Sequence, residues 1–412
     1  MSFTSDESRW TDVYLAAGAR GVSVCGDFLA ATTLALVLQQ SGHGGLAVSG
    51  LMLAASLPLA LLAPLTGRLA DRVDSRKILV GAGLAQAVTC LVLAFTTHPV
   101  LIIALVALLA CGLATTQPAN AALVPEMVRP DDLAKAGGLT QTAGVLGMLV
   151  GPALAGLLVG QAGARPALLI DAASYLAVVV AAVAIKTRRR GLPRETMATV
   201  RWRLRDDRTL TRLTGVLAAS VVGASAINVV ELFYIRDTLG ASTTVFGLVA
   251  ASWTGGMLIG TTLLSRLPRH RITVLAVLTA VAGSCLPALI GATVGTAYWL
   301  IPLWIVGGIC NGGINVFVMV LVADRTVGAV RGRAFAAVNA AVQSAGIIGL
   351  LAAGPLVDQF SPRLLLAAAG ATGVLAALAC LPLVMRQERR AYSRRRYRRS
   401  GDRDGVVGVT LP

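Results

Sequence analysis

Charged residues are scarce in this sequence. They make up 14% of its 412 residues, whereas hydrophobic residues make up 56%. In a soluble domain roughly a quarter of the residues are charged. The shortage of charge, together with long apolar runs, excludes an ordinary soluble domain and predicts a polytopic membrane protein.

Motifs for catalysis and for nucleotide hydrolysis are also missing. The sequence holds no G-x-x-x-x-G-K-[ST] phosphate loop, no H-E-x-x-H zinc motif and no G-x-S-x-G nucleophile elbow. Its three histidines, His43, His98 and His270, are scattered among loops. The sequence therefore predicts no enzyme, no cofactor, no metal site and no direct use of ATP.

The cysteines give no sign of a disulfide framework or a zinc site, because none of them forms a C-x-x-C pair. All of them fall inside apolar runs, where we expect them to be packing residues. They are Cys25, Cys90, Cys111, Cys285, Cys310 and Cys380.

Long apolar runs are what the sequence has in abundance. Each run of about 20 apolar residues can cross a bilayer, and in lipid it must do so as a helix, because an open strand edge would leave backbone groups unpaired. The first run is longer than the core of a signal peptide, so we expect no cleavable signal. The expected spans lie near 17–39, 46–66, 78–97, 100–122, 138–160, 167–186, 211–235, 245–264, 272–292, 298–322, 336–357 and 364–385.

The longest polar interruption follows the sixth run and divides the chain into two halves. The dipeptide Gly151-Pro152 of the fifth run recurs as Gly354-Pro355 in the eleventh, which indicates a weak internal duplication. The sequence thus predicts an all-α membrane protein of two pseudo-symmetric six-helix bundles. The expected divisions are an N-terminal bundle at 1–186, a cytoplasmic linker at 187–210, a C-terminal bundle at 211–385 and a basic, disordered tail at 386–412.

The basic residues predict the orientation in the membrane. The formal net charge is +16, and if the segment 67–77 is placed inside, only Arg165, Arg236 and Arg363 of the 36 Lys and Arg residues fall in outside loops. Cytoplasmic loops carry such an excess of Lys and Arg. We therefore expect both termini in the cytoplasm, and the positive charge gives no reason to expect a nucleic-acid partner.

Two basic segments leave alternatives open. The linker is either an amphipathic stretch with Trp202 at the membrane surface or a flexible tether. The tail Arg386–Arg399 holds eight arginines, and such a cluster next to a membrane attracts anionic lipids. Binding of some other regulatory partner is the alternative for the tail.

A charged segment between the second and third runs carries a family resemblance. It reads G-R-L-A-D-R-V-D-S-R-K over Gly67–Lys77, and it resembles the signature loop of the major facilitator superfamily, G-x-L-a-D-r-x-g-r-k. Asp74 stands where that family usually has glycine. The resemblance implies a transporter of two six-helix halves, with substrate near the midplane between them, and a loop that acts as a gate. The matching residues are Gly67, Leu69, Asp71, Arg72, Arg76 and Lys77.

The fifth run carries a second motif. Its G-x-x-x-G pairs let helices approach closely, and packing alone explains them in one interpretation. The whole spacing also resembles the motif G-x8-G-x3-G-P-x-x-G-G of drug–proton antiporters in the same superfamily, with Ala155 in place of one glycine. That resemblance implies export and a kinked seal between the halves. The matching residues are Gly138, Gly147, Gly151, Pro152 and Gly156.

Ionisable residues inside the spans are candidates for function, because each is costly there. Asp27 lies seven residues after Arg20 on nearly the same face of the first helix. One interpretation is a structural pair with Arg20. The other is a proton carrier, since a carboxyl group removed from water can take up and release a proton near neutral pH.

Two further carboxylates, Glu231 and Asp171, lie nearer the outer ends of their runs. Arg236 follows Glu231 and Arg165 precedes Asp171, so pairing at the membrane surface is the expectation for both. A coupling or substrate-binding role is the alternative. The fourth run lacks the arginine that many antiporters of this superfamily carry, which favours Asp27 as the coupling group.

Polar side chains within the spans are candidates for a transport cavity, although each one alone is more often a contact between helices. Asn311 and Asn315 lie four residues apart on one face of the tenth run, among several glycines. The candidates are Arg20, Gln117, Asn120, Gln141, Asn228, Asn311 and Asn315.

The sequence as a whole predicts a monomeric transporter of the cytoplasmic membrane. It resembles the macrolide- and siderophore-exporter branch of the superfamily, which implies export of an amphipathic small molecule in exchange for protons. An importer or facilitator on the same fold is one alternative. A membrane sensor or assembly partner that transports nothing is another.

Overall fold

The computed structural model describes residues 8–187, 204, 207–326 and 328–382. In this part of the chain the regular structure is helical, and 12 helices are long and apolar enough to cross a membrane. This confirms the predicted all-α fold and its number of spans. A helix satisfies its own backbone hydrogen bonds, which is why these apolar runs fold in this way.

The helices fall into two groups along the chain. The first group consists of α1 (Trp10–Gln40), α2 (Gly44–Arg72), α3 (Ser75–Ala94), α4 (Pro99–Leu123), α5 (Leu133–Ala162) and α6 (Ala164–Ala184). The second consists of α7 (Arg208–Phe233), α8 (Thr243–Leu264), α9 (Val274–Gly291), α10 (Leu300–Arg325), α11 (Gly328–Gln359) and a last span, Pro362–Pro382.

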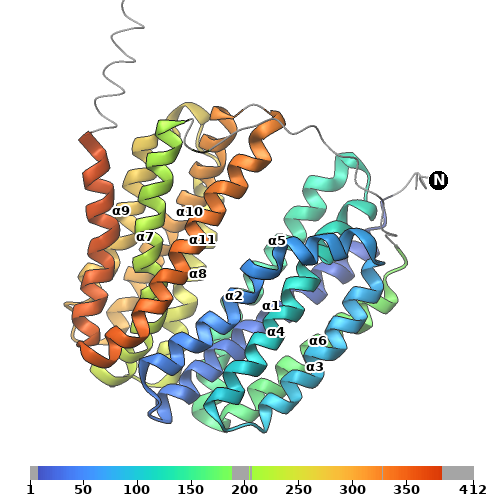
Figure 1. Ribbon diagram of the computed structural model, residues 1–412, viewed down its shortest axis with the longest axis horizontal. Helices are drawn as coiled ribbons and strands as arrows, with labels where there is room; N and C mark the ends of the chain where they lie inside the picture. Colours follow the sequence, from blue (N-terminus) through green and yellow to red (C-terminus); the bar gives the residue numbers. More distant parts are fainter. Residues whose placement is uncertain (1–7, 188–203, 205–206, 327, 383–412) are drawn as a thin grey trace, which may run out of the picture.

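The two groups form two bundles that lie side by side (Figure 1). They touch at one end, where α2 packs against α11 and α5 against α8, and they diverge toward the other end. We call the diverging end, where the chain passes from α6 to α7, the linker end, and the opposite end the far end. Most of the predicted linker and the whole tail, 386–412, lie outside the described residues.

The hydrophobic core has the same asymmetry. One large cluster lies toward the far end and includes residues of both bundles, such as Leu38 and Leu51 from the first and Phe246 and Leu350 from the second. Toward the linker end each bundle has a separate cluster of its own. Among the described residues, burial of apolar surface therefore joins the two bundles mainly at the far end.

The segment 67–77 differs from the predicted loop. Helix α2 continues to Arg72 and α3 begins at Ser75, so that only Val73 and Asp74 lie between them. The side chain of Asp74 accepts a hydrogen bond from the backbone N–H of Arg76 at 2.8 Å, and it caps the first turn of α3. An aspartate thus replaces the family's usual glycine, because this tight connection needs no left-handed residue. The side chains of Asp71 and Arg72 are not among those described, so the gate stays a prediction.

Candidate functional site

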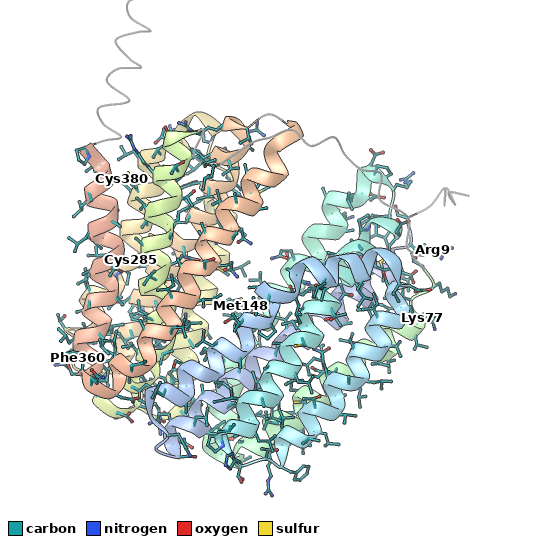
Figure 2. The ribbon with its side chains drawn as sticks, viewed as in Figure 1. Arg9, Lys77, Met148, Cys285, Phe360 and Cys380 are labelled. Carbon is teal, nitrogen blue, oxygen red and sulfur yellow. The ribbon has the colours of Figure 1, made fainter. Side chains whose placement is uncertain are left out.

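A cavity of about 620 Å³ lies between the two bundles. Met148 marks its wall on the first bundle (Figure 2). The first bundle contributes few other lining residues, nearly all of them apolar, and the second contributes most of the wall from α7 through α11. A cavity of this volume falls in the range of small-molecule binding sites.

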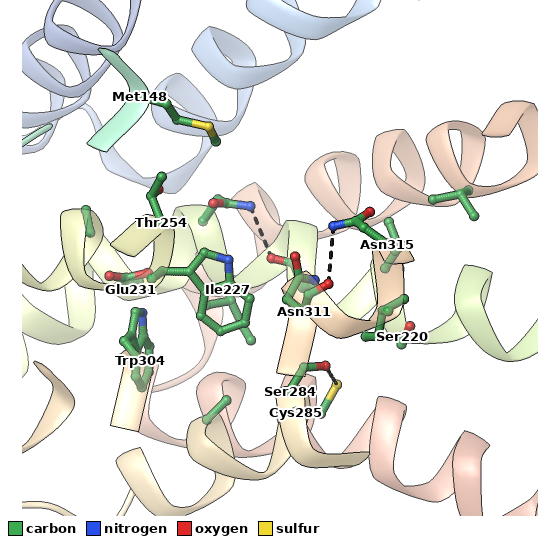
Figure 3. Close-up of a pocket in the computed structure, with 18 of the residues that line it drawn as sticks. Met148, Ser220, Ile227, Glu231, Thr254, Ser284, Cys285, Trp304, Asn311 and Asn315 are labelled. Carbon is green, nitrogen blue, oxygen red and sulfur yellow. Dashed lines mark hydrogen bonds between the residues drawn. The ribbon is translucent and has the colours of Figure 1, made fainter. Parts of the chain in front are cut away.

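The polar lining comes almost entirely from the second bundle. Asn228, Asn311 and Asn315, which the sequence predicts for a cavity, all line this one. The amide nitrogen of Asn315 donates to the backbone oxygen of Asn311 at 3.2 Å, and that of Asn228 donates to the backbone oxygen of Ala224 at 3.1 Å (Figure 3). The side-chain oxygens of Asn228 and Asn315 are therefore left as acceptors for a ligand.

Glu231 supplies the negative charge of the cavity. Its side chain is only 8% exposed, and its Oε1 atom has no hydrogen-bond partner among the residues that the structure describes. The indole of Trp304 lies beside the carboxyl group (Figure 3). The expected surface pair with Arg236 is wrong, because Arg236 donates instead to the backbone oxygen of Ala241.

A second, smaller pocket of about 60 Å³ lies inside the first bundle. It has room for a few water molecules. Arg20, Gln117 and Asn120 line this pocket, together with Asp27, rather than the cavity between the bundles. Gln141, the remaining cavity candidate, lines neither space. The sequence candidates thus divide between two separate polar sites.

Asp27 is held by a neighbouring helix. The hydroxyl of Tyr175, on α6, donates to Oδ1 of Asp27 at 2.5 Å. No ion pair joins Arg20 to Asp27 in the described part of the chain, so the structural pair is wrong. Arg20 extends instead toward Gly144 of α5, and its Nε atom is buried without a hydrogen-bond partner. The two charged groups share a pocket without touching.

Asp171 is fully buried next to Asp27. Its carboxyl group accepts hydrogen bonds from Ser174 and Cys90, both at 3.2 Å, and it lies against Gly26 of α1. The expected surface pair with Arg165 is wrong, because Arg165 lies over the ring of Phe95 at 5.7 Å. Asp27, Tyr175 and Asp171 therefore form one cluster between α1 and α6, in which Asp171 and Tyr175 are buried and Asp27 lines the small pocket.

Three members of the two sites were missed or undervalued in the sequence. Tyr175 stands four residues after Asp171, a spacing that places both on one helix face, and this could have revealed their association. Cys90 was assigned to packing alone, yet its thiol contacts Asp171. Trp304 has no comparable signal, because a tryptophan near a helix end is typical of a membrane interface.

The glycines of the fifth span divide into three environments. Gly147 and Gly151 lie against the backbone of α1, where an added Cβ would come within 2.8 Å of Cys25 N and 2.7 Å of Cys25 O, respectively. Gly156 lies against Thr243 and Gly247 of α8, in the other bundle. Gly138 has no neighbouring atom within 4 Å. The close-packing interpretation is confirmed for three of the motif's glycines, and one of these packs across the two bundles.

Among the described residues, no group of His, Cys, Asp and Glu could hold a metal ion.

The profile of the Major Facilitator Superfamily matches residues 16–285 and 213–406, which together span nearly the whole chain. The chain belongs to the Major Facilitator Superfamily. Members of this family are transporters and not enzymes, and the cavity between the two halves is where this superfamily fold places its substrate.

Curated relatives of this superfamily member include two proteins called macrolide efflux protein A. The chain is 31% identical to the one from Enterococcus faecalis over 147 residues, which are 34% of this chain and 45% of that protein. It is 31% identical to the one from Streptococcus pyogenes over 134 residues, which are 31% of this chain and 32% of that protein. The chain thus matches less than half the length of these relatives.

Solved structures of the superfamily resemble this one throughout. A bacterial homologue of the iron transporter ferroportin in an inward-facing state has a TM-score of 0.72 at 16% identity, with 91% of this chain and 99% of that chain covered. A nucleoside transporter, NupG, has a TM-score of 0.71 at 15% identity, with 90% and 99% covered. At such identities the likeness shows the fold alone.

Proposed function

We propose that this protein exports an amphipathic small molecule across the cytoplasmic membrane in exchange for protons, by alternating access. The observation that carries the proposal is the presence of two separate polar sites. A cavity of about 620 Å³ between the bundles has the size for a substrate, and a pocket of about 60 Å³ around Asp27 has room for water and protons only.

The charge distribution supports an orientation with the linker end in the cytoplasm. Lys77, Lys135 and Arg325 lie near helix ends at the linker end, in line with the excess of basic residues that cytoplasmic loops carry. Arg165 and Arg363 are at the far end, where basic residues are sparse. The bundles meet at the far end, so this conformation would open to the cytoplasm, where an exporter takes up its substrate.

Proton coupling in this proposal belongs to the cluster around Asp27. Its pocket extends from Asp27 toward the linker end, where Ala16, Leu79 and Ile185 line it. Water in such a pocket would connect the carboxyl group with the cytoplasm. Asp171, behind Asp27, is the second carboxylate that could share the proton, and intramembrane carboxylates in transporters commonly serve such relays.

Export rather than import is supported by the relatives and by the fifth span. The proteins from Enterococcus faecalis and Streptococcus pyogenes are named for macrolide efflux. The motif Gly147, Gly151, Pro152 and Gly156 resembles that of antiporters, and Gly156 packs against α8 of the other bundle, where a seal between the halves would be needed. Because both polar sites lie within one chain, we propose that a monomer transports. The basic tail would hold anionic lipids.

Inverted membrane vesicles that contain the protein test this proposal. With an acidic lumen, added macrolides or lipophilic cations should accumulate inside and should trigger proton release, and Asp27→Asn should abolish both. Accumulation that survives the mutation would move coupling to Asp171 or Glu231. Substrate movement only out of the lumen would indicate an importer. If the folded protein moved none of these compounds, the result would favour a membrane sensor or assembly partner that transports nothing.

A further inference from the structure

The central cavity has an electrostatic bias that narrows the class of substrate. Glu231 is the single carboxylic acid among the described residues that line it, and none of those lining residues is Lys, Arg or His. A carboxylate in a mostly apolar site is poorly compensated when no cation is near. A ligand with one positive charge would balance the charge of Glu231, which no described lining residue balances.

The carboxyl group of Glu231 is only partly satisfied by the described part of the chain. Glu231 is more than nine-tenths buried, yet its Oε1 atom has no partner within the protein and the residue lines the cavity wall. The nearest basic residue along the helix, Arg236, is engaged with Ala241. No basic side chain among the described lining residues therefore balances the charge of this carboxylate at the cavity wall.

The surroundings of Glu231 also suit a bulky organic cation. Trp304 lies beside it, and Trp253 lines the cavity with its ring fixed against Gly307 of α10. Indole faces attract cations that have lost water. The wall on the first bundle is apolar, apart from Thr32, and can receive a hydrophobic body.

We propose that the central cavity binds a hydrophobic organic monocation, with its charge at Glu231 and its apolar body against the first bundle. This inference rests on the proposed transport function, and it narrows the substrate class that the sequence left open. Anionic compounds, including siderophores that carry carboxylates or catecholates, are excluded as good substrates, because none of the described residues that line the cavity is basic. The substrate charge and the proton would be held in different halves of the molecule.

Binding to the purified full-length protein in detergent tests the proposal without any proton gradient. The probes are tetraphenylphosphonium and tetraphenylborate, which have the same shape and opposite charge. Equilibrium dialysis, with empty micelles subtracted, should show at least tenfold tighter binding of the cation. Glu231→Gln should remove this preference, and Glu231→Asp should keep most of it. Asp324→Asn, which removes an exposed carboxylate at the linker end of α10, is the matched control and should bind as the wild type does.

Three results would overturn the proposal: no binding of the cation by folded wild-type protein, equal binding of both probes, or an unchanged preference in Glu231→Gln. Failure of the Asp27 proposal would appear only in the vesicle experiment, as accumulation and proton release that survive Asp27→Asn. The two proposals can therefore fail independently.

Discussion

Asp358, near the end of α11, accepts a hydrogen bond from the backbone N–H of Gly45, in the first turn of α2, at 2.6 Å. The same carboxylate accepts a second, longer bond from Leu46 at 3.4 Å. These bonds connect the two bundles at the far end. A carboxylate at a helix N-terminus also interacts favourably with the helix dipole. A second polar contact across the bundles, from Gln39 to Asp237 at 2.6 Å, lies nearby.

Removing Asp358 should loosen the far end. A hydrogen bond to a charged group contributes about 1.5–3 kcal/mol, so Asp358→Ala should speed hydrogen exchange in the first turn of α2 by about tenfold or more. Mass spectrometry of peptides that cover Gly44–Ala47 measures this. Asp131→Ala, which removes an exposed carboxylate at the linker end, is the control. Equal exchange in both variants would show that the bonds do not hold the bundles together.

Tyr175→Phe should weaken proton coupling while the protein stays folded. The change removes the hydroxyl that holds Asp27 at 2.5 Å and leaves the ring in place. We expect substrate-triggered proton release in inverted vesicles to fall about tenfold, in line with the loss of one bond to a charged group. Tyr234→Phe is the matched control. Tyr234 lies in the second bundle, away from Asp27, and its hydroxyl donates to the backbone oxygen of Gly291 in that same bundle. Similar losses in both variants would point to general destabilisation.

The topology could be predicted from the sequence because a run of about 20 apolar residues is a strong and local signal. The length of the run predicts a helix that spans the membrane, and the basic loops predict the orientation of that helix. The ends of the helices around the segment 67–77 could not be predicted in the same way, since charged residues such as Arg72 occur both in the last turn of a helix and in the loop that follows it. The structure resolves this through the cap at Asp74, a local contact that composition does not reveal.

The partners of the buried carboxylates could not be predicted as well, because closeness in sequence is not closeness on a helix. Each residue turns the helix by about 100°. Arg165 and Asp171 therefore lie about 120° apart around the helix, and Asp171 faces Ser174 and Cys90 instead. Which residues of other helices come near is a property of packing, which a single sequence does not show.

Asp74→Ala should lower the thermal stability of the protein more than Asp74→Gly does. The carboxylate of Asp74 caps α3 through the N–H of Arg76, and loss of such a cap to alanine costs about 1 kcal/mol, whereas glycine costs only a few tenths. Thermal unfolding followed by intrinsic fluorescence measures the order. A lower melting temperature for the glycine variant than for the alanine variant would contradict the capping role.

Two glycines of the fifth span offer a matched test of the contact between the bundles. A Cβ at Gly156 would collide with the backbone of Thr243 and Gly247 in α8, whereas a Cβ at Gly138 would meet nothing within 4 Å. Overpacking of this kind typically costs about 1–3 kcal/mol. Gly156→Ala should therefore hinder closure of the far end and reduce transport by about tenfold, and Gly138→Ala should leave it unchanged. Transport by reconstituted protein, with insertion confirmed for both variants, measures the difference. Equal activity of the two variants would mean that α5 and α8 separate freely here, and that the motif does not seal the halves.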